Sequence, residues 1–246
     1  MSTRSPARLP FDARGGLIVL IDPGRSTADD AFVIASRAAD GGACGFLVGD
    51  SLGKGDRVSE HVAAIRDGSG GAPVVQFPAS AADLNADVDA VLFLVLVSGR
   101  NPRYLIEEQL AAVPFFERHG HVAAVSTAYV LIDGGRVSSV ERVTGTRPLS
   151  GDDVASISRH VRAGQLMGMH ATYLEAGSGA TAPIDPRAIE AARKATTGPM
   201  LVGGGITTEQ AARDARAAGA DYVVVGTLFE RDRAIVVHAL AEAARA

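Results

Sequence analysis

Three glycine-bearing segments in the C-terminal half of the chain have the composition of a phosphate site. They are Glu175–Gly179 (EAGSG), Gly203–Thr207 (GGGIT) and Gly226-Thr227, and each comes at the end of an apolar run. Glycine lets the backbone approach a ligand closely and turn its N–H groups toward it. The GGGIT segment also leads into a helical pattern, whose positive dipole end attracts an anion. A tight turn is the better explanation of any one segment, but the three together predict a phosphate-binding site.

Polar side chains at the ends of apolar runs could carry out chemistry beside that phosphate. Glu175 is the best-placed general base, and a salt bridge to an arginine is the alternative. Tyr173 shares its face, because side chains two apart on a strand point to the same side. Asp22 and Ser51 follow two early runs, and Mg²⁺ is usually held by one or two carboxylates together with substrate phosphates. Asp50 is a rival ligand, and Asp22 is equally well explained as a cap of the following loop.

The apolar runs that end at these residues alternate with segments of helical period. We predict strands at 17–22, 45–49, 73–76, 90–95, 122–132, 171–175, 200–203 and 221–226. Near-continuous apolar composition is expected of parallel strands that are buried on both faces. The pattern predicts an α/β fold, a single (β/α)8 TIM barrel domain over 1–246, with an open doubly wound sheet as the alternative. Barrel active sites lie at the C-terminal ends of the strands, where the glycine segments fall.

Capping residues and glycines mark the helices between the strands. We predict helices from Thr27 to about Asp40, from Asp56 to about Asp67, from Pro102 to about His119, from Asp152 through Met167, from Pro186 onward, over 208–218 after a Thr207 cap, and from about Arg231 to Ala244. Residues 77–89 are too few for a helix with two loops, so we expect the third helix to be missing or modified. Asp133–Gly135 is a hairpin-type turn signal, and we predict a β-excursion over 136–143 before the fifth helix.

Length and composition limit the class of protein. The chain has 246 residues, close to the ~250 of a one-domain barrel, and 47% of them are apolar. The net charge of −4 gives no electrostatic reason to expect nucleic acid. A single cysteine, Cys44, excludes an intramolecular disulfide, and the six histidines have no metal-ligand spacing. Without a signal-peptide pattern, and with a longest apolar stretch over 90–97, we expect a cytoplasmic protein with at most peripheral membrane contact.

Taken together, the motifs resemble the geranylgeranylglyceryl phosphate synthase family of prenyltransferases over almost the whole chain. The segments that carry the resemblance are LIDP (20–23), VGDS (48–51), FLVLVSGRNPRYLIEEQ (93–109), STAYVLIDG (126–134), YLEAGSGA (173–180), VGGGI (202–206) and Gly226-Thr227. The combination of YLEAGSGA and VGGGI at this spacing is highly specific. The resemblance also implies a barrel with a modified third helix.

The resemblance implies an alkyl transfer between two substrates. The sn-3 hydroxyl of sn-glycerol 1-phosphate would attack C1 of a polyprenyl diphosphate, most often geranylgeranyl diphosphate, and diphosphate would leave. Mg²⁺ would be held by Asp22 and Ser51, Arg25 would contact phosphate, and Glu175 would accept the hydroxyl proton beside Tyr173. The glycerol phosphate would be bound at Tyr173, Leu174, Glu175, Ala176, Gly177, Ser178, Gly179, Gly204, Gly205, Gly226 and Thr227. The family further implies a homo-oligomer, either a dimer or a hexamer.

Two segments depart from the family pattern, both at the diphosphate end. Asp-Pro-Asp-Lys is here DPGR (22–25), and a loop that commonly reads Phe-Pro-Gly-Asn is FPAS (77–80). The acceptor is therefore better supported than the donor. We expect the prenyl chain in an apolar groove around Phe93, Tyr104 and Tyr129, opened by the missing helix. A barrel isomerase acting on another phosphorylated metabolite and a non-catalytic phosphate-binding barrel are the alternatives.

Overall fold

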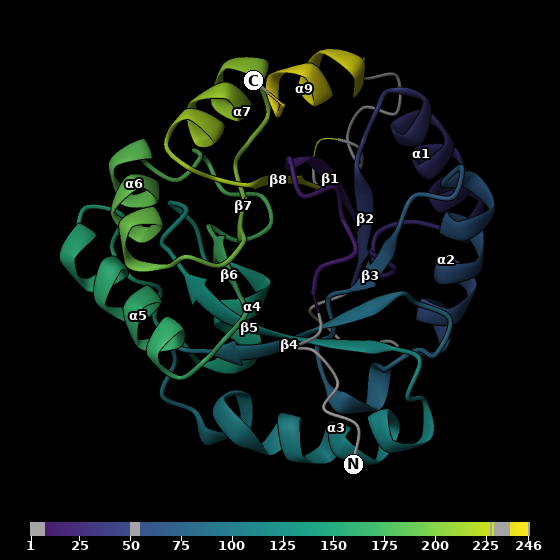
Figure 1. Ribbon diagram of the computed structural model, residues 1–246, viewed down its shortest axis with the longest axis horizontal. Coiled ribbons are helices and arrows are strands. Elements are labelled where there is room, and N and C mark those ends of the chain that lie inside the picture. The colour runs from purple at the N-terminus through teal and green to yellow at the C-terminus, as the bar shows by residue number, and fades with distance from the viewer. Residues whose placement is uncertain (1–7, 50–54, 227, 229–236, 246) are drawn as a thin grey trace.

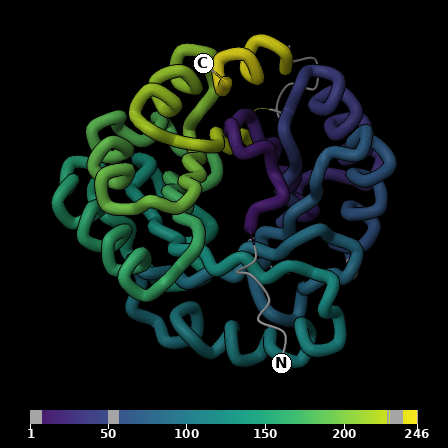
Figure 2. Tube along the Cα trace, viewed as in Figure 1, coloured from purple at the N-terminus to yellow at the C-terminus, as the bar shows by residue number. Residues whose placement is uncertain are grey.

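The computed structural model describes residues 8–49, 55–226, 228 and 237–245, and within them the strands form one closed barrel. Each strand pairs in parallel with the next, in the order β1 to β8. The barrel closes because Gly16–Val19 of β1 pairs with Tyr222–Val225 of β8. Figures 1 and 2 show the strands at the centre and the helices around them. The predicted barrel is confirmed, and the open sheet is excluded.

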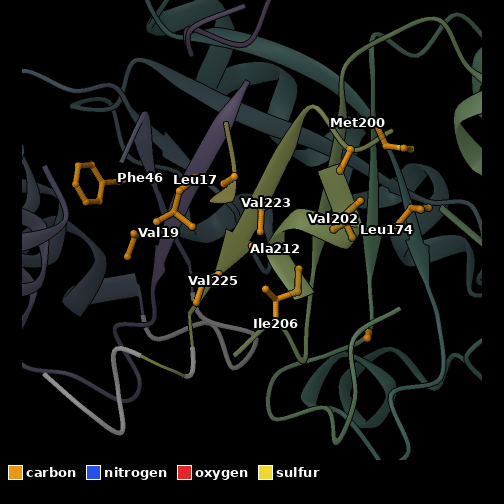
Figure 3. Packing of buried hydrophobic residues seen from close by; sticks show 14 of the residues in the cluster. Leu17, Val19, Phe46, Leu174, Met200, Val202, Ile206, Ala212, Val223 and Val225 are labelled. Atoms are coloured by element: carbon orange, nitrogen blue, oxygen red, sulfur yellow. The ribbon is translucent and has the colours of Figure 1, made fainter. Parts of the chain in front are cut away.

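The strands lie within one or two residues of their predicted positions. They are β1 (Gly16–Ile21), β2 (Gly45–Val48), β3 (Val74–Gln76), β4 (Ala90–Leu96), β5 (Ala123–Leu131), β6 (Ala171–Glu175), β7 (Met200–Gly203) and β8 (Tyr222–Val225). Alternate residues serve two apolar layers, as the period of a strand requires. In β1, Leu17 and Val19 pack against the helices, whereas Ile18 faces the barrel interior. Figure 3 shows part of the outer layer, which joins β1, β2 and the strands β6 to β8.

The helices in the described part of the chain surround this barrel, except for one short helix that lies over its strands, inside the ring of the others (Figure 1). They are α1 (Ala28–Asp40), α2 (Gly55–Gly68), α3 (Glu108–Arg118), α4 (Ser139–Thr144), α5 (Val154–Leu166), α6 (Pro186–Ala195), α7 (Glu209–Ala217) and α9 (Val237–Ala243), with a 3₁₀ turn η1 (Ala81–Asp83) and a π-helical turn η2 (Arg103–Glu107). The segment expected to be one helix from Pro102 thus begins as η2 and continues as α3. None of these helices is long and apolar enough to cross a membrane.

The caps of two helices show where local chemistry sets the boundary. Thr27 caps α1 as predicted: its hydroxyl accepts the Asp30 N–H at 3.2 Å, and the Asp30 carboxylate accepts the Thr27 N–H at 3.1 Å. The predicted Thr207 cap of α7 is wrong by one residue. Thr208 caps that helix, because its hydroxyl accepts the Ala211 N–H at 3.2 Å. The predicted start of the last helix lies outside the described residues.

The third helix is missing, as the short spacing predicted. Between β3 and β4 the chain forms only the turn η1. Glu108 at the start of α3 ties this turn in place, because its Oε2 accepts the Ala81 N–H at 2.8 Å and its Oε1 accepts from Arg103 Nε at 2.7 Å. The side of the barrel beside β3 and β4 is therefore covered by η1 together with η2 and α3, and not by a helix of its own.

The predicted β-excursion over 136–143 is wrong, because the segment forms the short helix α4. Ser138 caps it through its hydroxyl, which accepts the Glu141 N–H at 3.0 Å, and Gly145 ends it with a φ of 65°. Serine followed three residues later by glutamate is a helix-start signal, and the three-residue spacing of Val137, Val140 and Val143 is also helical. The turn that precedes α4 is an Asx turn, in which the Asp133 carboxylate accepts the Gly135 N–H at 2.8 Å.

Candidate functional site

The C-terminal ends of the strands surround a pocket of about 810 Å³ that includes space open to solvent. Most of the predicted site residues line it. These are Asp22, Tyr173, Glu175, Gly177, Ser178, Gly179, Gly204, Gly205 and Gly226. The glycine segments after β6, β7 and β8 therefore meet around one space, as their positions at the strand ends predicted.

The remaining predicted residues do not present side chains to this pocket in the described part of the chain. Leu174 and Ala176 pack in the apolar layer between strands and helices, so they offer a ligand only their backbone; Figure 3 shows Leu174 beside Val202 in that layer. Arg25 is not among the described lining residues, and its Nε lies 3.4 Å from Asp22 Oδ2. Ser51, its rival Asp50, and Thr227 lie outside the described residues.

Glu175 is a buried carboxylate, with only 6% of its surface exposed. Its Oε1 accepts the Gly177 N–H at 2.8 Å. Burial raises the pKa of the Glu175 carboxyl, while the Tyr173 hydroxyl and the Gly177 N–H, which favour the anion, limit the rise. The described residues provide no ion pair to Glu175 within 4 Å, so the salt bridge considered as the alternative is not found there. A carboxyl group with a raised pKa in a pocket has the properties of a general base.

Two tyrosines lie beside this carboxylate. The Tyr129 and Tyr173 hydroxyls are buried and meet no partner in hydrogen-bond geometry among the described residues, although the Tyr173 hydroxyl is close enough to Glu175 to favour its charged form. Burial is the main cause that raises the pKa of both tyrosines well above its usual value, and the neighbouring Glu175 charge adds to it. Both hydroxyls therefore keep their protons at neutral pH and remain available as hydrogen-bond donors.

The loop after β7 must be glycine because Glu175 packs directly against it. A Cβ atom at Gly203 would lie 2.8 Å from both Glu175 Oε2 and the Tyr173 hydroxyl, and one at Gly204 would lie 2.8 Å from Glu175 Oε1. Gly204 also has a φ of 86° and Gly205 a φ of 71°, a region that side-chain-bearing residues rarely adopt. The candidate base and the predicted phosphate loop are thus in direct contact.

An apolar groove of about 810 Å³, open space included, adjoins the pocket. Phe93, Tyr104 and Tyr129 line it, as predicted, together with residues from η1, β4, α3 and α4. It lies where the third helix is missing. Phe77, Tyr129 and Val140 line both the groove and the pocket, so the two spaces meet at these side chains.

Three aromatic rings form the junction. The ring centroids of Phe77, Tyr129 and Tyr173 are separated by 5.5 to 5.6 Å, within the range of favourable aromatic contacts. Phe77 and Val140 were missed as pocket residues by the sequence. Tyr129 was expected only in the groove, although it is directly paired with Tyr173 in the register of β5 and β6. Extending the strand register from Tyr173 to the neighbouring strand would have placed Tyr129 in the pocket.

Asp22 is the described residue that fits a metal ion in this pocket. Its Oδ1 accepts the Gly24 N–H at 2.7 Å, which is the capping role considered in the sequence, and its side chain is 17% exposed. No cluster of three or more histidine, cysteine, aspartate or glutamate residues suited to a metal occurs in the described ranges. A single carboxylate fits Mg²⁺ only when substrate phosphates supply further oxygens.

At the mouth of the (β/α)8 barrel, a glycine-lined pocket that suits a phosphate and contains a buried carboxylate joins an apolar groove. This arrangement defines a barrel enzyme that acts on an anionic and an apolar group together. Within this class the chain belongs to the PcrB family, whose model matches residues 12–244.

Named relatives agree with this assignment. The chain is 38% identical over 224 residues, 90% of this chain and 88% of the relative, to geranylgeranylglyceryl phosphate synthase of Spirosoma linguale. It is 36% identical over 238 residues, 94% and 89% of the two chains, to the synthase of the same name from Aeropyrum pernix. The crystal structure of (S)-3-O-geranylgeranylglyceryl phosphate synthase from Thermoplasma acidophilum in complex with sn-glycerol-1-phosphate superposes with a TM-score of 0.87 at 27% identity, covering 94% and 93% of the chains.

The raised pKa of Glu175 predicts a pH-dependent cost in stability. A carboxyl whose pKa is raised by folding stabilises the folded state below its ordinary pKa, and this contribution is lost as the pH rises through the raised value. The stability of Glu175→Gln relative to the wild type should therefore increase as the pH is raised from acidic to neutral. Urea unfolding at a series of pH values measures this difference. Glu117→Gln, which removes an exposed carboxylate of α3, should follow the wild-type trend. A pH-independent difference for Glu175→Gln would contradict the assignment.

The close packing at Gly204 predicts a selective intolerance of a side chain. Gly204→Ala incurs the cost of a positive φ, roughly 1–2 kcal/mol, and must also displace Ala176, whose backbone nitrogen would lie 2.8 Å away, and Glu175. Gly168→Ala has a similar φ of 82° with nothing within 4 Å of the new Cβ atom, so it carries the backbone cost alone. Urea unfolding should show a greater loss of stability for Gly204→Ala. Equal losses would mean that the packing of Ala176 and Glu175 against Gly204 does not restrict this position.

Proposed function

We propose that this protein is a prenyltransferase that joins the sn-3 hydroxyl of sn-glycerol 1-phosphate to C1 of a polyprenyl diphosphate. The observation that carries the proposal is the direct junction of the glycine-lined pocket with the apolar groove, with Glu175 beside it. The relatives named geranylgeranylglyceryl phosphate synthase, and the Thermoplasma acidophilum structure with its bound sn-glycerol-1-phosphate, support the same reaction. We expect geranylgeranyl diphosphate to be the donor.

In this reaction the acceptor phosphate binds among the glycine loops after β6, β7 and β8. Backbone N–H groups and the start of α7 suit its negative charge. This places the glycerol beside Glu175, which accepts the proton of the sn-3 hydroxyl while that oxygen forms a bond to C1 of the donor. The C1–O bond to diphosphate breaks, and diphosphate leaves with the bonding electrons. Tyr173 orients the carboxylate from the same face of β6.

The apolar chain and the charged diphosphate of the donor occupy different spaces, the groove and the pocket. Its apolar chain occupies the groove, whose burial of hydrocarbon contributes roughly 0.8 kcal/mol per CH₂ group. Its diphosphate lies toward Asp22, at the β1 side of the pocket. We propose that Mg²⁺ is held there by Asp22 and diphosphate oxygens, where it supplies charge stabilisation for the leaving group. An isomerase acting on a small phosphorylated metabolite would have no use for the groove.

The proposal is tested by product formation. The protein is incubated with labelled sn-glycerol 1-phosphate and prenyl diphosphates of short, medium and long chain, with and without Mg²⁺, and the lipid product is extracted into organic solvent. We expect an ether product that requires Mg²⁺. Glu175→Gln should lower kcat by about 10²–10⁴, the contribution typical of general-base catalysis. No product with any donor would refute the proposal, and an isomerised phosphate compound without ether formation would favour the isomerase.

The groove predicts control of donor length by α3. Ala112 is buried in the groove wall, so Ala112→Phe fills part of the space and should shift the preference toward shorter prenyl diphosphates. Ala111→Phe changes the adjacent, exposed position of the same helix and serves as the matched control. The measurement is kcat/KM for each donor. An unchanged ranking of donors in Ala112→Phe would show that the groove does not hold the prenyl chain.

A further inference from the structure

The loop that carries Asp22 is held from outside the pocket by two side chains of α2. Arg57 Nη2 donates to the Ser26 carbonyl oxygen at 2.9 Å, and His61 Nε2 lies 3.1 Å from the same oxygen. The Ser26 hydroxyl in turn donates to the Asp22 carbonyl oxygen at 2.9 Å. In Figure 1, α2 lies beside α1 on the outer face of the barrel. A continuous set of hydrogen bonds thus runs from α2 through Ser26 to Asp22.

The His61 ring lies in position to contact Ser26, and this contact distinguishes it from a residue that only packs in the core. It is only 1% exposed, and its Nδ1 lies 2.7 Å from the Arg57 carbonyl oxygen while its Nε2 faces Ser26. Both partners are carbonyl oxygens, which accept and never donate, so a neutral imidazole donates to one of them, through the nitrogen that carries the proton. An apolar residue would fill the same space without the cost of burying a polar ring. The position of the imidazole between the two carbonyl oxygens therefore points to a function in holding Ser26 and Arg57.

The geometry of the Asp22 loop depends on where Ser26 is held. Within the loop, Gly24 donates to the Asp22 carboxylate at 2.7 Å and Arg25 donates its N–H to the Asp22 carbonyl at 3.0 Å. These bonds fix the shape of the turn. At one end the turn continues directly from Ile21 of β1, and at its other end Ser26 joins it to α2.

We infer that Arg57 and His61 are positioning residues that hold the Asp22 carboxylate in the pocket for the anionic end of the donor. Neither residue is among those that line the pocket, so they act through Ser26 and not by touching a substrate. The identity of that anion as a diphosphate rests on the proposed function. The hydrogen bonds of Arg57 and His61 run to Ser26 and within α2, so the proposed contacts of the acceptor with the loops after β6, β7 and β8 should not depend on them.

Equilibrium binding of inorganic diphosphate with MgCl₂ tests the inference without any turnover. Isothermal titration calorimetry on Arg57→Ala should show diphosphate affinity reduced by about tenfold or more, the effect typical of losing a residue that orients a metal-binding side chain. Affinity for sn-glycerol 1-phosphate should be unchanged. Arg57→Lys keeps a donor in reach of Ser26 and should restore most of the diphosphate affinity.

Two further variants separate positioning from general damage. Arg66→Ala removes a guanidinium from the same helix, but one that bonds the Asp87 carbonyl and pairs with Asp89 at 3.1 Å, so diphosphate affinity should be unchanged. His61→Gln retains one donor and should show an intermediate loss, with thermal unfolding used to check that it folds. Since Arg57 is only half-buried, its replacement tests the inference even if His61→Gln does not fold.

Steady-state kinetics provide the second readout. Arg57→Ala should raise KM for the prenyl diphosphate and leave KM for sn-glycerol 1-phosphate unchanged. An unchanged diphosphate affinity in Arg57→Ala, or an equal loss for both ligands, would overturn the inference. If no donor gives product while Arg57→Ala still weakens diphosphate binding, the positioning role holds and the proposed reaction fails.

Discussion

A carboxylate buried as deeply as that of Glu175 loses the hydration that stabilises its charge, and the surrounding structure has to replace part of it. The Gly177 N–H and the nearby Tyr173 hydroxyl do so, and the glycines after β7 allow the backbone to come within contact of the carboxylate oxygens. The same glycines form the loop in which the acceptor phosphate is proposed to bind. The pKa of Glu175 and the proposed binding of the acceptor phosphate therefore depend on the same packing of Glu175 against the glycines after β7.

The missing third helix supplies the second requirement of the reaction, a long apolar space beside a polar one. Removing a helix from a barrel would ordinarily expose the outer face of the sheet. Here η1, η2 and α3 cover that side at a distance, with Glu108 joining the segments, and the groove remains between them and β4. The rings of Phe77, Tyr129 and Tyr173 pack together at the boundary between this groove and the charged pocket, where the two spaces meet.

The strands, the closed barrel and most of the pocket were predictable because they follow from strong local signals: continuous apolar runs and glycines at strand ends. The direction in which individual side chains point was harder to predict. Leu174 and Ala176 belong to the same motif as Glu175, but the alternation of a strand turns their side chains toward the helices. The α4 segment has both a serine cap and valines at helical spacing, but the hairpin-type turn before it suggested a strand, and the Thr208 cap depends on one hydroxyl that a hydrophobic pattern does not register. Mg²⁺ and the homo-oligomer stay predictions.

The division of the site between two stretches of chain has an evolutionary consequence. The groove is built mainly from residues 77–116 and the acceptor loops from 173–207 with Gly226, while β1 and β8 close the barrel. Apart from Phe77, Tyr129 and Val140, which line both spaces, the residues of the groove can change without replacing a residue of the acceptor loops. Descendants of such an enzyme can therefore diverge in the lipid they make by drift in one stretch, while selection keeps the headgroup chemistry constant in the other.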